Sequence, residues 1–265
     1  MLSIRNISKT FNKGTINEKV ALDRINLELA PGDFITVIGS NGAGKSTMLN
    51  SVAGNFFVDS GQILIDEIDI SRLPQHKRAV YISRVFQDPM LGTAATMTIE
   101  ENMVMALRRG EPRRMRKAIS VQQRNLFRQE LAKLGLGLET RLTTRVNLLS
   151  GGQRQALTLL MATLKEPKLL LLDEHTAALD PKTAEKVMDL TCQVTEAHHL
   201  TTLMITHNLD QALSFGNRTI MMHEGRIILD IRGQERADMT ISRLLEMFEE
   251  ASGTHMHNDR MMLTY

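Results

Sequence analysis

The segment that most constrains this chain is residues 39–47, which match the phosphate-binding pattern G-x-x-x-x-G-K-[ST] at every fixed position. An apolar run at 34–38 precedes it, and a helical pattern with Met48, Leu49 and Val52 on one side follows it. This is the strand, loop and helix context that the pattern requires. Glycines let backbone N–H groups turn inward toward an anion, and the following helix directs its positive dipole end at the same phosphates. The sequence therefore predicts a nucleotide site.

The residues expected to contact the nucleotide are those of the loop itself: Ser40, Asn41, Gly42, Ala43, Gly44, Lys45, Ser46 and Thr47. In such loops the lysine, here Lys45, reaches the β- and γ-phosphates, and the following hydroxyl, here Ser46, lies on Mg²⁺. A glycine-rich turn that only caps a helix has no need of this lysine.

Composition leaves few other classes of protein open. The chain has 265 residues, a formal net charge of +2 and one cysteine, Cys192, so it forms no internal disulfide and suits a reducing compartment. The sequence shows no metal-binding cluster and no run of about 18 apolar residues, the length that a membrane-spanning helix needs. We therefore expect a cytoplasmic protein that reaches a membrane only through a partner.

Apolar and polar residues alternate in two runs, at 2–7 and at 20–29. This alternation predicts half-buried strands that are antiparallel and lie beside the strand at 34–38. Between them, Phe11 lies in a polar stretch that predicts a loop. An aromatic ring there either stacks on a nucleotide base or anchors the loop against the protein.

Polar residues follow three further apolar runs. Gln87 comes after the run at 80–86, Asp173 and Glu174 after the continuously apolar run at 168–172, and His207 after the run at 201–206. Runs that are apolar throughout predict strands of a parallel sheet covered on both faces, and open α/β sheets bind ligands at the carboxyl ends of such strands. Asp173 is placed to hold Mg²⁺ directly or through water, and Glu174 to accept a proton from an attacking water. Gln87 either reaches the metal ion or only turns the chain.

The middle of the chain predicts a helical insertion. Helical periodicity runs from 99 to 134, and residues 108–133 carry nine basic and two acidic side chains, a net charge of +7. This basic face is either solvated or a docking surface for anionic lipid or a partner. Ser150, Gly151, Gly152 and Gln153 then open another helix and form a second candidate anion site. A helix cap explains Ser150 but not the paired glycines with Gln153.

The C-terminal third predicts a helix from Pro181 to about 197, a hairpin at 220–229 with Glu224-Gly225 at its turn, and an amphipathic helix at 241–248. The tail at 251–265 contains His255 and His257. These histidines could bind a metal ion, although a frayed terminus is the expected state.

Taken together, these motifs resemble the nucleotide-binding subunits of ABC transporters. Residues 39–47 are similar to the Walker A loop, 149–153 to the LSGGQ signature, 169–173 to the Walker B strand and 178–180 to the D-loop. Phe11 resembles the A-loop aromatic, Gln87 the Q-loop residue and His207 the switch histidine. The chain departs from the family pattern at His175, where many members have proline, and at Ala177, where serine is common.

The resemblance implies an α/β P-loop NTPase of the ABC ATPase fold, with a RecA-like core sheet, an antiparallel β subdomain and an all-helical signature subdomain. The expected domain spans 1–250, with the helical part at about 90–165 and a tail at 251–265. It also implies a head-to-tail homodimer in which Ser150, Gly151, Gly152 and Gln153 of one subunit complete the Walker A site of the other. ATP and Mg²⁺ are the implied cofactors.

The implied activity is ATP hydrolysis coupled to transport, with Glu174, His207, Lys45 and Gln87 as catalytic residues and Ser46, Gln87 and Asp173 as metal ligands. The implied partners are permease subunits and a separate solute-binding protein, with no nucleic acid. Import is expected over export, because most bacterial exporters of the family fuse the two domains. The compact layout and the run at 173–180 are similar to those of a bacterial subfamily of the tryptophan/tyrosine-import type, and this resemblance implies an amino-acid-type solute. The alternative is a non-transport ABC ATPase acting on nucleic acid, ribosomes or iron–sulfur assembly.

Overall fold

The computed structural model describes residues 1–111 and 119–253 and divides the chain into two compact units. The first comprises Met1–Arg78 with Leu200–Tyr265, and the second comprises Ala79–His199. Arg113, Arg114, Arg116 and Lys117 of the basic segment, and His255 and His257 of the tail, lie outside the described residues.

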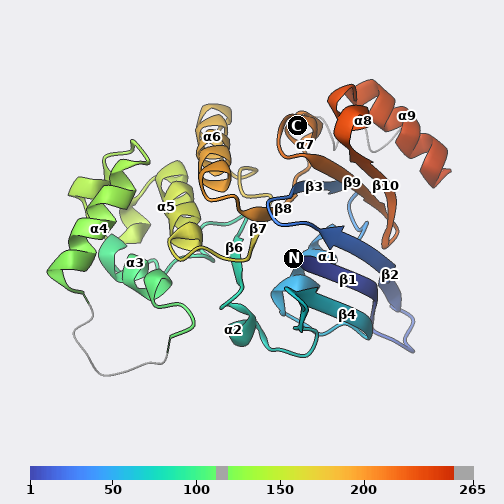
Figure 1. Ribbon diagram of the computed structural model, residues 1–265, viewed down its shortest axis with the longest axis horizontal. Helices are drawn as coiled ribbons and strands as arrows, with labels where there is room; N and C mark the ends of the chain where they lie inside the picture. The colour runs from blue at the N-terminus through green and yellow to red at the C-terminus, as the bar shows by residue number, and fades with distance from the viewer. Residues whose placement is uncertain (112–118, 254–265) are drawn as a thin grey trace. The chain divides into compact units, whose positions relative to one another are not determined.

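The first unit begins with an antiparallel sheet in the order β2-β1-β4-β5 (Figure 1). Its strands are β1 (Leu2–Phe11), β2 (Lys19–Leu29), β4 (Ser60–Ile65) and β5 (Ile68–Asp69). The predicted antiparallel pairing of β1 with β2 is confirmed, with Leu2 opposite Leu29. Their predicted place beside the strand at 34–38 is wrong, because β1 pairs with β4 on its other side and the strands form a sheet of their own.

The other strands of the first unit lie in the order β10-β9-β3-β8. They are β3 (Phe34–Gly39), β8 (Thr201–Ile205), β9 (Arg218–His223) and β10 (Arg226–Arg232). Strand β3 runs parallel to both β8 and β9, so Val37 lies between Ile205 and Ile220. Both β3 and β8 are buried almost throughout, as expected for strands covered on two faces.

Helices of the first unit pack on these strands. Helix α1 (Lys45–Ala53) contacts both β2 and β3 and so joins the two sheets. Helices α7 (Leu209–Ser214) and α9 (Ile241–Ser252) cover β3, β9 and β10 (Figure 1), where Ile38, Met221 and Phe248 belong to one buried apolar cluster. The short helices of this unit are α2 (Gln75–Arg78) and α8 (Gly233–Ala237).

The C-terminal end of α1 is held by Arg78, which is 1 % exposed. Its guanidinium donates to the carbonyls of Ser51 at 2.6 Å and Val52 at 2.9 Å, and to those of Leu73 and Ser71. Burial lowers the pKa of Arg78 to about 10, so it stays charged at neutral pH. Arg78 therefore occupies the carbonyls that the end of the helix leaves without intrahelical partners.

The second unit combines a parallel strand pair with helices. Strands β6 (Ile82–Val85) and β7 (Leu169–Asp173) pair with Val85 opposite Leu172. The helices are α3 (Ile99–Leu107), α4 (Val121–Ala132), α5 (Gly151–Thr163) and α6 (Pro181–Ala197), with 3₁₀ turns η1 (Leu138–Thr140) and η2 (Val146–Leu148). Helices α3, α4 and α5 share a buried core that includes Met103, Phe127 and Leu157. The helices predicted from 99 onward and from Pro181 are thus present.

Candidate functional site

The loop between β3 and α1 adopts backbone angles that only glycine takes easily. Gly39, Gly42 and Gly44 have φ values of 141°, 80° and 102°. A Cβ at Gly39 would lie 2.1 Å from the carbonyl oxygen of Met222, and one at Gly44 would lie 2.5 Å from that of Ala21. Neighbouring backbone thus encloses the loop on two sides, which fixes its shape.

The start of α1 has the features of an anion site. Its N-cap, Gly44, offers no side-chain hydrogen bond to the first turn of the helix. The buried Lys45 amine lies 2.6 Å from the Gly39 carbonyl oxygen and 3.0 Å from that of Ser40, so it is held across the loop. Ser46 is exposed and Thr47 is half-buried. N–H groups, a dipole and a cation therefore converge on one concave segment, the arrangement that suits a nucleotide's phosphates.

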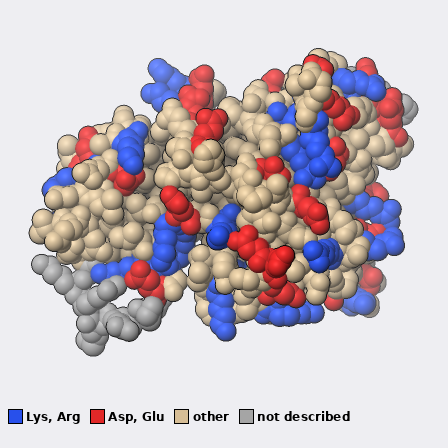
Figure 2. Space-filling model, viewed as in Figure 1, with Lys and Arg blue, Asp and Glu red and all other residues tan. Residues whose placement is uncertain are grey.

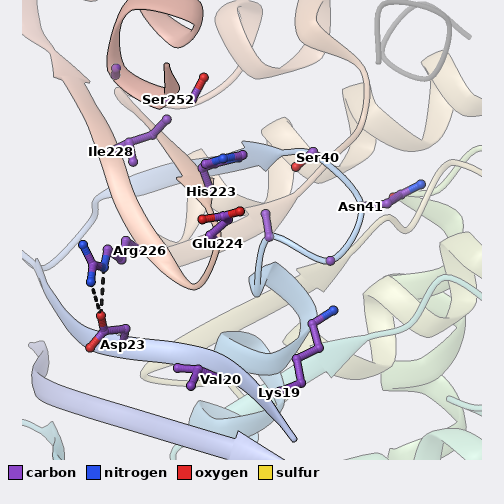
Figure 3. Close-up of a pocket in the computed structure, with 13 residues that line it drawn as sticks. Lys19, Val20, Asp23, Ser40, Asn41, His223, Glu224, Arg226, Ile228 and Ser252 are labelled. Atoms are coloured by element: carbon purple, nitrogen blue, oxygen red, sulfur yellow. Dashed lines mark hydrogen bonds and ion pairs between the residues drawn. The ribbon is translucent and has the colours of Figure 1, made fainter. Parts of the chain in front are cut away.

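A cavity of about 880 Å³ borders this loop in the first unit. Ser40, Asn41, Gly42 and Ala43 form one side of it (Figure 3). The start of β2, the β9–β10 hairpin and the end of α9 contribute the rest, among them Lys19, Asp23, His223, Glu224, Arg226 and Ser252. Arg226 donates to Asp23 at 2.8 Å, and this hydrogen bond lowers the Asp23 pKa.

Phe11 is not in a loop as predicted. It is the last residue of β1 and pairs with Lys19, because the strand pairing continues through the polar residues Lys9 and Thr10. The Phe11 ring contacts Phe56 edge to face, with centroids 5.4 Å apart, and is half-buried. The ring is thus anchored against the protein, which is one of the two alternatives given for this residue. That it also stacks on a base stays a prediction.

His207 and the phosphate loop follow neighbouring strands. Because β3 and β8 are parallel and adjacent, their carboxyl ends lie at the same edge of the sheet. Thr206 accepts a hydrogen bond from the Asn208 backbone, and Asn208 caps α7. The half-buried His207 is thus fixed between a strand end and a capped helix on the edge that carries the phosphate loop.

The second unit brings Gln87 together with Asp173 and Glu174 in the same way. They follow β6 and β7, which are adjacent and parallel. Gln87 is exposed, and both carboxylate residues are half-buried. Glu174 has a φ of 46°, a left-handed conformation that costs a non-glycine residue of order 1–3 kcal/mol. Such strain occurs where the surrounding structure fixes a side chain in one direction.

Arg84 engages the predicted metal ligand Asp173, a pairing that the sequence did not indicate. Its Nη2 lies 2.5 Å from Asp173 Oδ2, and its guanidinium lies over the Phe86 ring at 4.6 Å. The available signal was a single arginine within the apolar run at 80–86. Asp173 is thus oriented by a cation from the neighbouring strand.

Gly152 and Gln153 of the second candidate anion site have local structural reasons. Ser150 caps α5 by accepting from the Gln153 backbone at 3.2 Å, and Gln153 Oε1 accepts from the Ser150 N–H in return. A Cβ at Gly152 would lie 2.1 Å from Thr183 Cγ2 on α6. The interpretation that a helix cap does not account for Gln153 is therefore wrong, since the capping box uses it. Ser150 and Gly151 remain exposed.

Two arginines of the basic segment stabilise the fold instead of forming a free surface. Arg109 donates to the carbonyls of Ala162 and Lys165 near the end of α5, and burial lowers its pKa. Arg124 forms two hydrogen bonds with Glu100 at 2.7 and 2.9 Å, which raise the Arg124 pKa. Figure 2 shows acidic and basic side chains interspersed on the visible face. Two of the nine basic side chains, those of Arg109 and Arg124, are thus engaged within the fold, whereas the sequence suggested either solvation or docking for the basic face.

The donor set suits Mg²⁺ that is bound mainly by phosphate. In the described part of the chain no group of three or more His, Cys, Asp or Glu residues could hold a metal ion alone. Mg²⁺ typically takes one or two protein oxygens and completes its shell with phosphates and water. Ser46 in the first unit, and Gln87 and Asp173 in the second, are oxygen donors of this kind.

Comparison with known proteins decides the family. The profile of the ABC transporter family matches residues 22–177. A tyrosine transport ATP-binding protein of Clostridioides difficile is 44% identical over 95% of this chain and 100% of its own length. This chain belongs to the ABC transporter family. It is an ATP-binding and ATP-hydrolysing subunit of that family, as the resemblance predicted.

Solved ABC cassettes share the fold. The dimeric cassette MJ0796 is 30% identical, with a TM-score of 0.73 over 88% of this chain and 98% of its own. MJ0796 is also known in a dimeric post-hydrolysis state bound to ADP and Pi, at 29% identity and a TM-score of 0.74. The predicted ABC ATPase fold is therefore confirmed.

Another relative of this ABC subunit is a thiamine import ATP-binding protein of Yersinia pseudotuberculosis, 37% identical over 77% of this chain and 81% of its own length. Within residues 1–111 and 119–253, none of the helices combines the length and the apolar composition that a membrane span requires.

Proposed function

We propose that this ABC subunit powers the import of an amino acid of the tyrosine type, together with a transmembrane permease and a separate solute-binding protein. The observation that carries this proposal is the 44% identity, over nearly the full length of both chains, to a tyrosine transport ATP-binding protein. A methionine import protein of Bartonella henselae, 30% identical over 92% of this chain, acts on the same class of solute. The site of action is the membrane surface, where the permease holds the subunit.

Two copies of the chain bind two ATP molecules head to tail. Lys45 and the N–H groups of α1 hold the phosphates of one nucleotide, and the exposed Ser150 and Gly151 of the other copy cover its γ-phosphate. In-line attack develops charge on the γ-phosphoryl oxygens, and donors on both sides stabilise that charge best when water is excluded. Gly152 and Gln153 shape this second wall, and Phe11 faces the base.

Glu174 polarises the attacking water and accepts its proton, while His207 contacts the γ-phosphate. Ser46, Gln87 and Asp173 hold Mg²⁺, directly or through water. When bound, this ion would neutralise charge on the phosphate oxygens. Gln87 also links the metal site to the helical part at about 90–165. In this division the domain at 1–250 performs the chemistry.

Replacing Glu174 tests the catalytic assignment. Glu174→Gln keeps the size of the side chain but removes the base, so we expect ATP binding to persist and turnover to fall at least 100-fold. The blocked variant should accumulate as a dimer with Mg²⁺ and ATP, measured by light scattering after size exclusion. Wild-type turnover in this variant would remove Glu174 from its role.

Purification from membranes tests the transport assignment. The tagged chain, extracted in mild detergent, should recover a permease, and the co-purifying solute-binding protein should bind tyrosine in a calorimeter. Recovery of ribosomes or nucleic acid without a permease would instead support the non-transport alternative.

A further inference from the structure

Gln155 of α5 ties together the two loops of the second unit that carry the proposed chemistry. Its side chain is fully buried. The amide Nε2 donates to the Phe86 carbonyl at 3.0 Å and to the His175 carbonyl at 2.7 Å. Phe86 immediately precedes Gln87, and His175 immediately follows Glu174. One side chain therefore joins both loops to the helix that begins at Gly151.

The orientation of this amide is fixed by its partners. Carbonyl oxygens only accept hydrogen bonds, so Nε2 must face both of them and both of its N–H groups are used. The other end of the amide, Gln155 Oε1, is buried and has no hydrogen-bond partner among the described residues. A buried acceptor without a partner is unfavourable, and an apolar side chain of the same length would avoid it. Packing alone would therefore not select glutamine here.

The residue after Glu174 is also fixed from a second helix. The Thr191 hydroxyl on α6 donates its only proton to the Val187 carbonyl at 2.7 Å. The contact of 3.0 Å between His175 Nε2 and Thr191 Oγ1 must therefore be a donation from the imidazole. His175 is thus held through its carbonyl by α5 and through its ring by α6. Glu174, in its left-handed conformation, has little freedom between β7 and this anchor.

We propose that Gln155 is a positioning residue for ATP hydrolysis: its amide sets the spacing between the loops of Gln87 and Glu174 and makes both follow α5. The inference rests on the roles proposed above for those two residues. A displacement of α5, whose first residues face the nucleotide of the other copy in the proposed dimer, is then passed to the general base and to the Q-loop together. Gln155 is fully buried, so it acts through these two loops and not by contact with the nucleotide.

The variant Gln155→Met tests the proposal, because it keeps the length of the side chain and removes both donors. In the full-length chain with Mg²⁺ and ATP, we expect kcat to fall at least tenfold while the dissociation constant for ATP, measured by calorimetry, changes less than twofold. Amide hydrogen exchange should rise at residues 86–89 and at 174–180 together. Weaker ATP binding with unchanged kcat would overturn the proposal.

Thr163→Val is the matched control. Thr163 is buried on the same helix, and within the part of the chain that the structure describes its hydroxyl bonds to the carbonyls of Leu159 and Leu160 of α5 alone. This variant loses a buried hydrogen-bonding group but no hydrogen bond to either loop, so its kcat should stay within twofold of wild type. If Gln155→Met and Thr163→Val have the same kcat, the proposal is wrong. Should Gln155→Met fail to fold, Gln155→Asn, whose amide is too short to reach both carbonyls, supplies the same comparison.

A double-variant cycle separates this proposal from the proposed function. If Gln155 acts through Glu174, adding Gln155→Met to Glu174→Gln should change the residual turnover less than twofold. A further tenfold loss would show that Gln155 acts elsewhere. Should Glu174→Gln alone retain turnover, the proposed function fails. If Glu174→Gln loses turnover but Gln155→Met has the same kcat as the control Thr163→Val, only the positioning role is refuted.

Discussion

At the scale of single residues, Gly44 shows how strictly the phosphate loop is determined. Its φ of 102° disfavours any side chain, and a Cβ would also meet the Ala21 carbonyl oxygen at 2.5 Å. Gly14 shares a positive φ, 77°, but nothing lies within 4 Å of the corresponding Cβ. Comparing substitutions at these two glycines therefore distinguishes the cost of backbone strain alone from the cost of strain plus a steric clash.

Gly44→Ala should lower the free energy of unfolding by about 3 kcal/mol, because left-handed strain and overpacking add. It should also weaken ATP binding, since the loop must shift to make room. Gly14→Ala should cost about 1 kcal/mol and leave ATP affinity unchanged. Urea denaturation and calorimetry measure both effects, and equal destabilisation by the two variants would contradict the steric argument.

His175 gives the stability a defined dependence on pH. Burial lowers its pKa from 6.5 to about 4, so the folded state holds a neutral ring where the unfolded chain binds a proton. The free energy of unfolding should therefore fall as pH drops from about 6.5 to 4, by on the order of 3 kcal/mol from this residue. Above pH 6.5 the residue contributes no slope.

The comparison of wild type with His175→Leu in urea at several pH values isolates this effect. The variant has no ring to protonate, so its stability should decline less over the same interval. Parallel pH profiles for the two proteins would exclude the buried imidazole as the cause.

At the scale of elements, α3, α4 and α5 all begin with a capping box, formed by Thr98 with Glu101, Ser120 with Gln123, and Ser150 with Gln153. The same local chemistry therefore sets three helix starts, and only the third belongs to the signature motif. The capping box by itself carries no functional meaning, and the exposed hydroxyl of Ser150 gains one only from its proposed partner in the dimer.

Thr98→Ala and Ser150→Ala should each cost about 1 kcal/mol of stability, because each removes one helix cap. Turnover should fall only in Ser150→Ala, whose hydroxyl is proposed to face the γ-phosphate. Thermal denaturation and a phosphate-release assay distinguish the two variants. A comparable loss of turnover in Thr98→Ala would mean that helix stability, and not the nucleotide contact, limits the activity.

The basic helix α4 can be tested with two of its arginines. Arg124→Glu places a carboxylate against the nearly buried Glu100 and should destabilise the fold. Arg128→Glu alters an exposed residue whose hydrogen bond is to Asn125, and should leave stability nearly unchanged. Denaturant titration measures both changes. The double charge exchange Glu100→Arg with Arg124→Glu should recover part of the lost stability. A permease-docking assay is best made with Arg128→Glu, because the fold of this variant should stay intact.

At the scale of the whole molecule, the motifs are divided between the two units. The phosphate loop, Phe11 and His207 belong to the first, and Gln87, the signature residues and Glu174 belong to the second. In the proposed dimer a complete site takes its Walker A loop from one copy and its signature from the other. Defects in the two motifs should then complement each other across subunits.

Mixing Lys45→Ala chains with Ser150→Arg chains tests this, with Glu174→Gln in every chain to block hydrolysis. A mixed dimer keeps one complete composite site, whereas neither variant alone keeps any. With Mg²⁺ and ATP, the two differently tagged variants should therefore pair with each other, which tag capture measures. Each variant should pair little with itself. Chains that carry only Glu174→Gln are the control and should pair. If they pair but the two variants do not pair with each other, the head-to-tail arrangement is contradicted.

The sequence by itself determined the local elements and the chemistry at their ends. Glycine spacing identified the phosphate loop, apolar runs identified β3, β7 and β8, and Pro181 correctly marked the start of α6. These features depend on residues close together in the chain, where backbone preference and periodicity are sufficient.

Only the tertiary structure decided what distant residues do for one another. It continued β1 through Phe11, paired Arg124 with Glu100 and Arg84 with Asp173, and placed Gln155 against two loops. Each of these outcomes is set by a partner many positions away, through desolvation and hydrogen bonding that a local pattern does not encode.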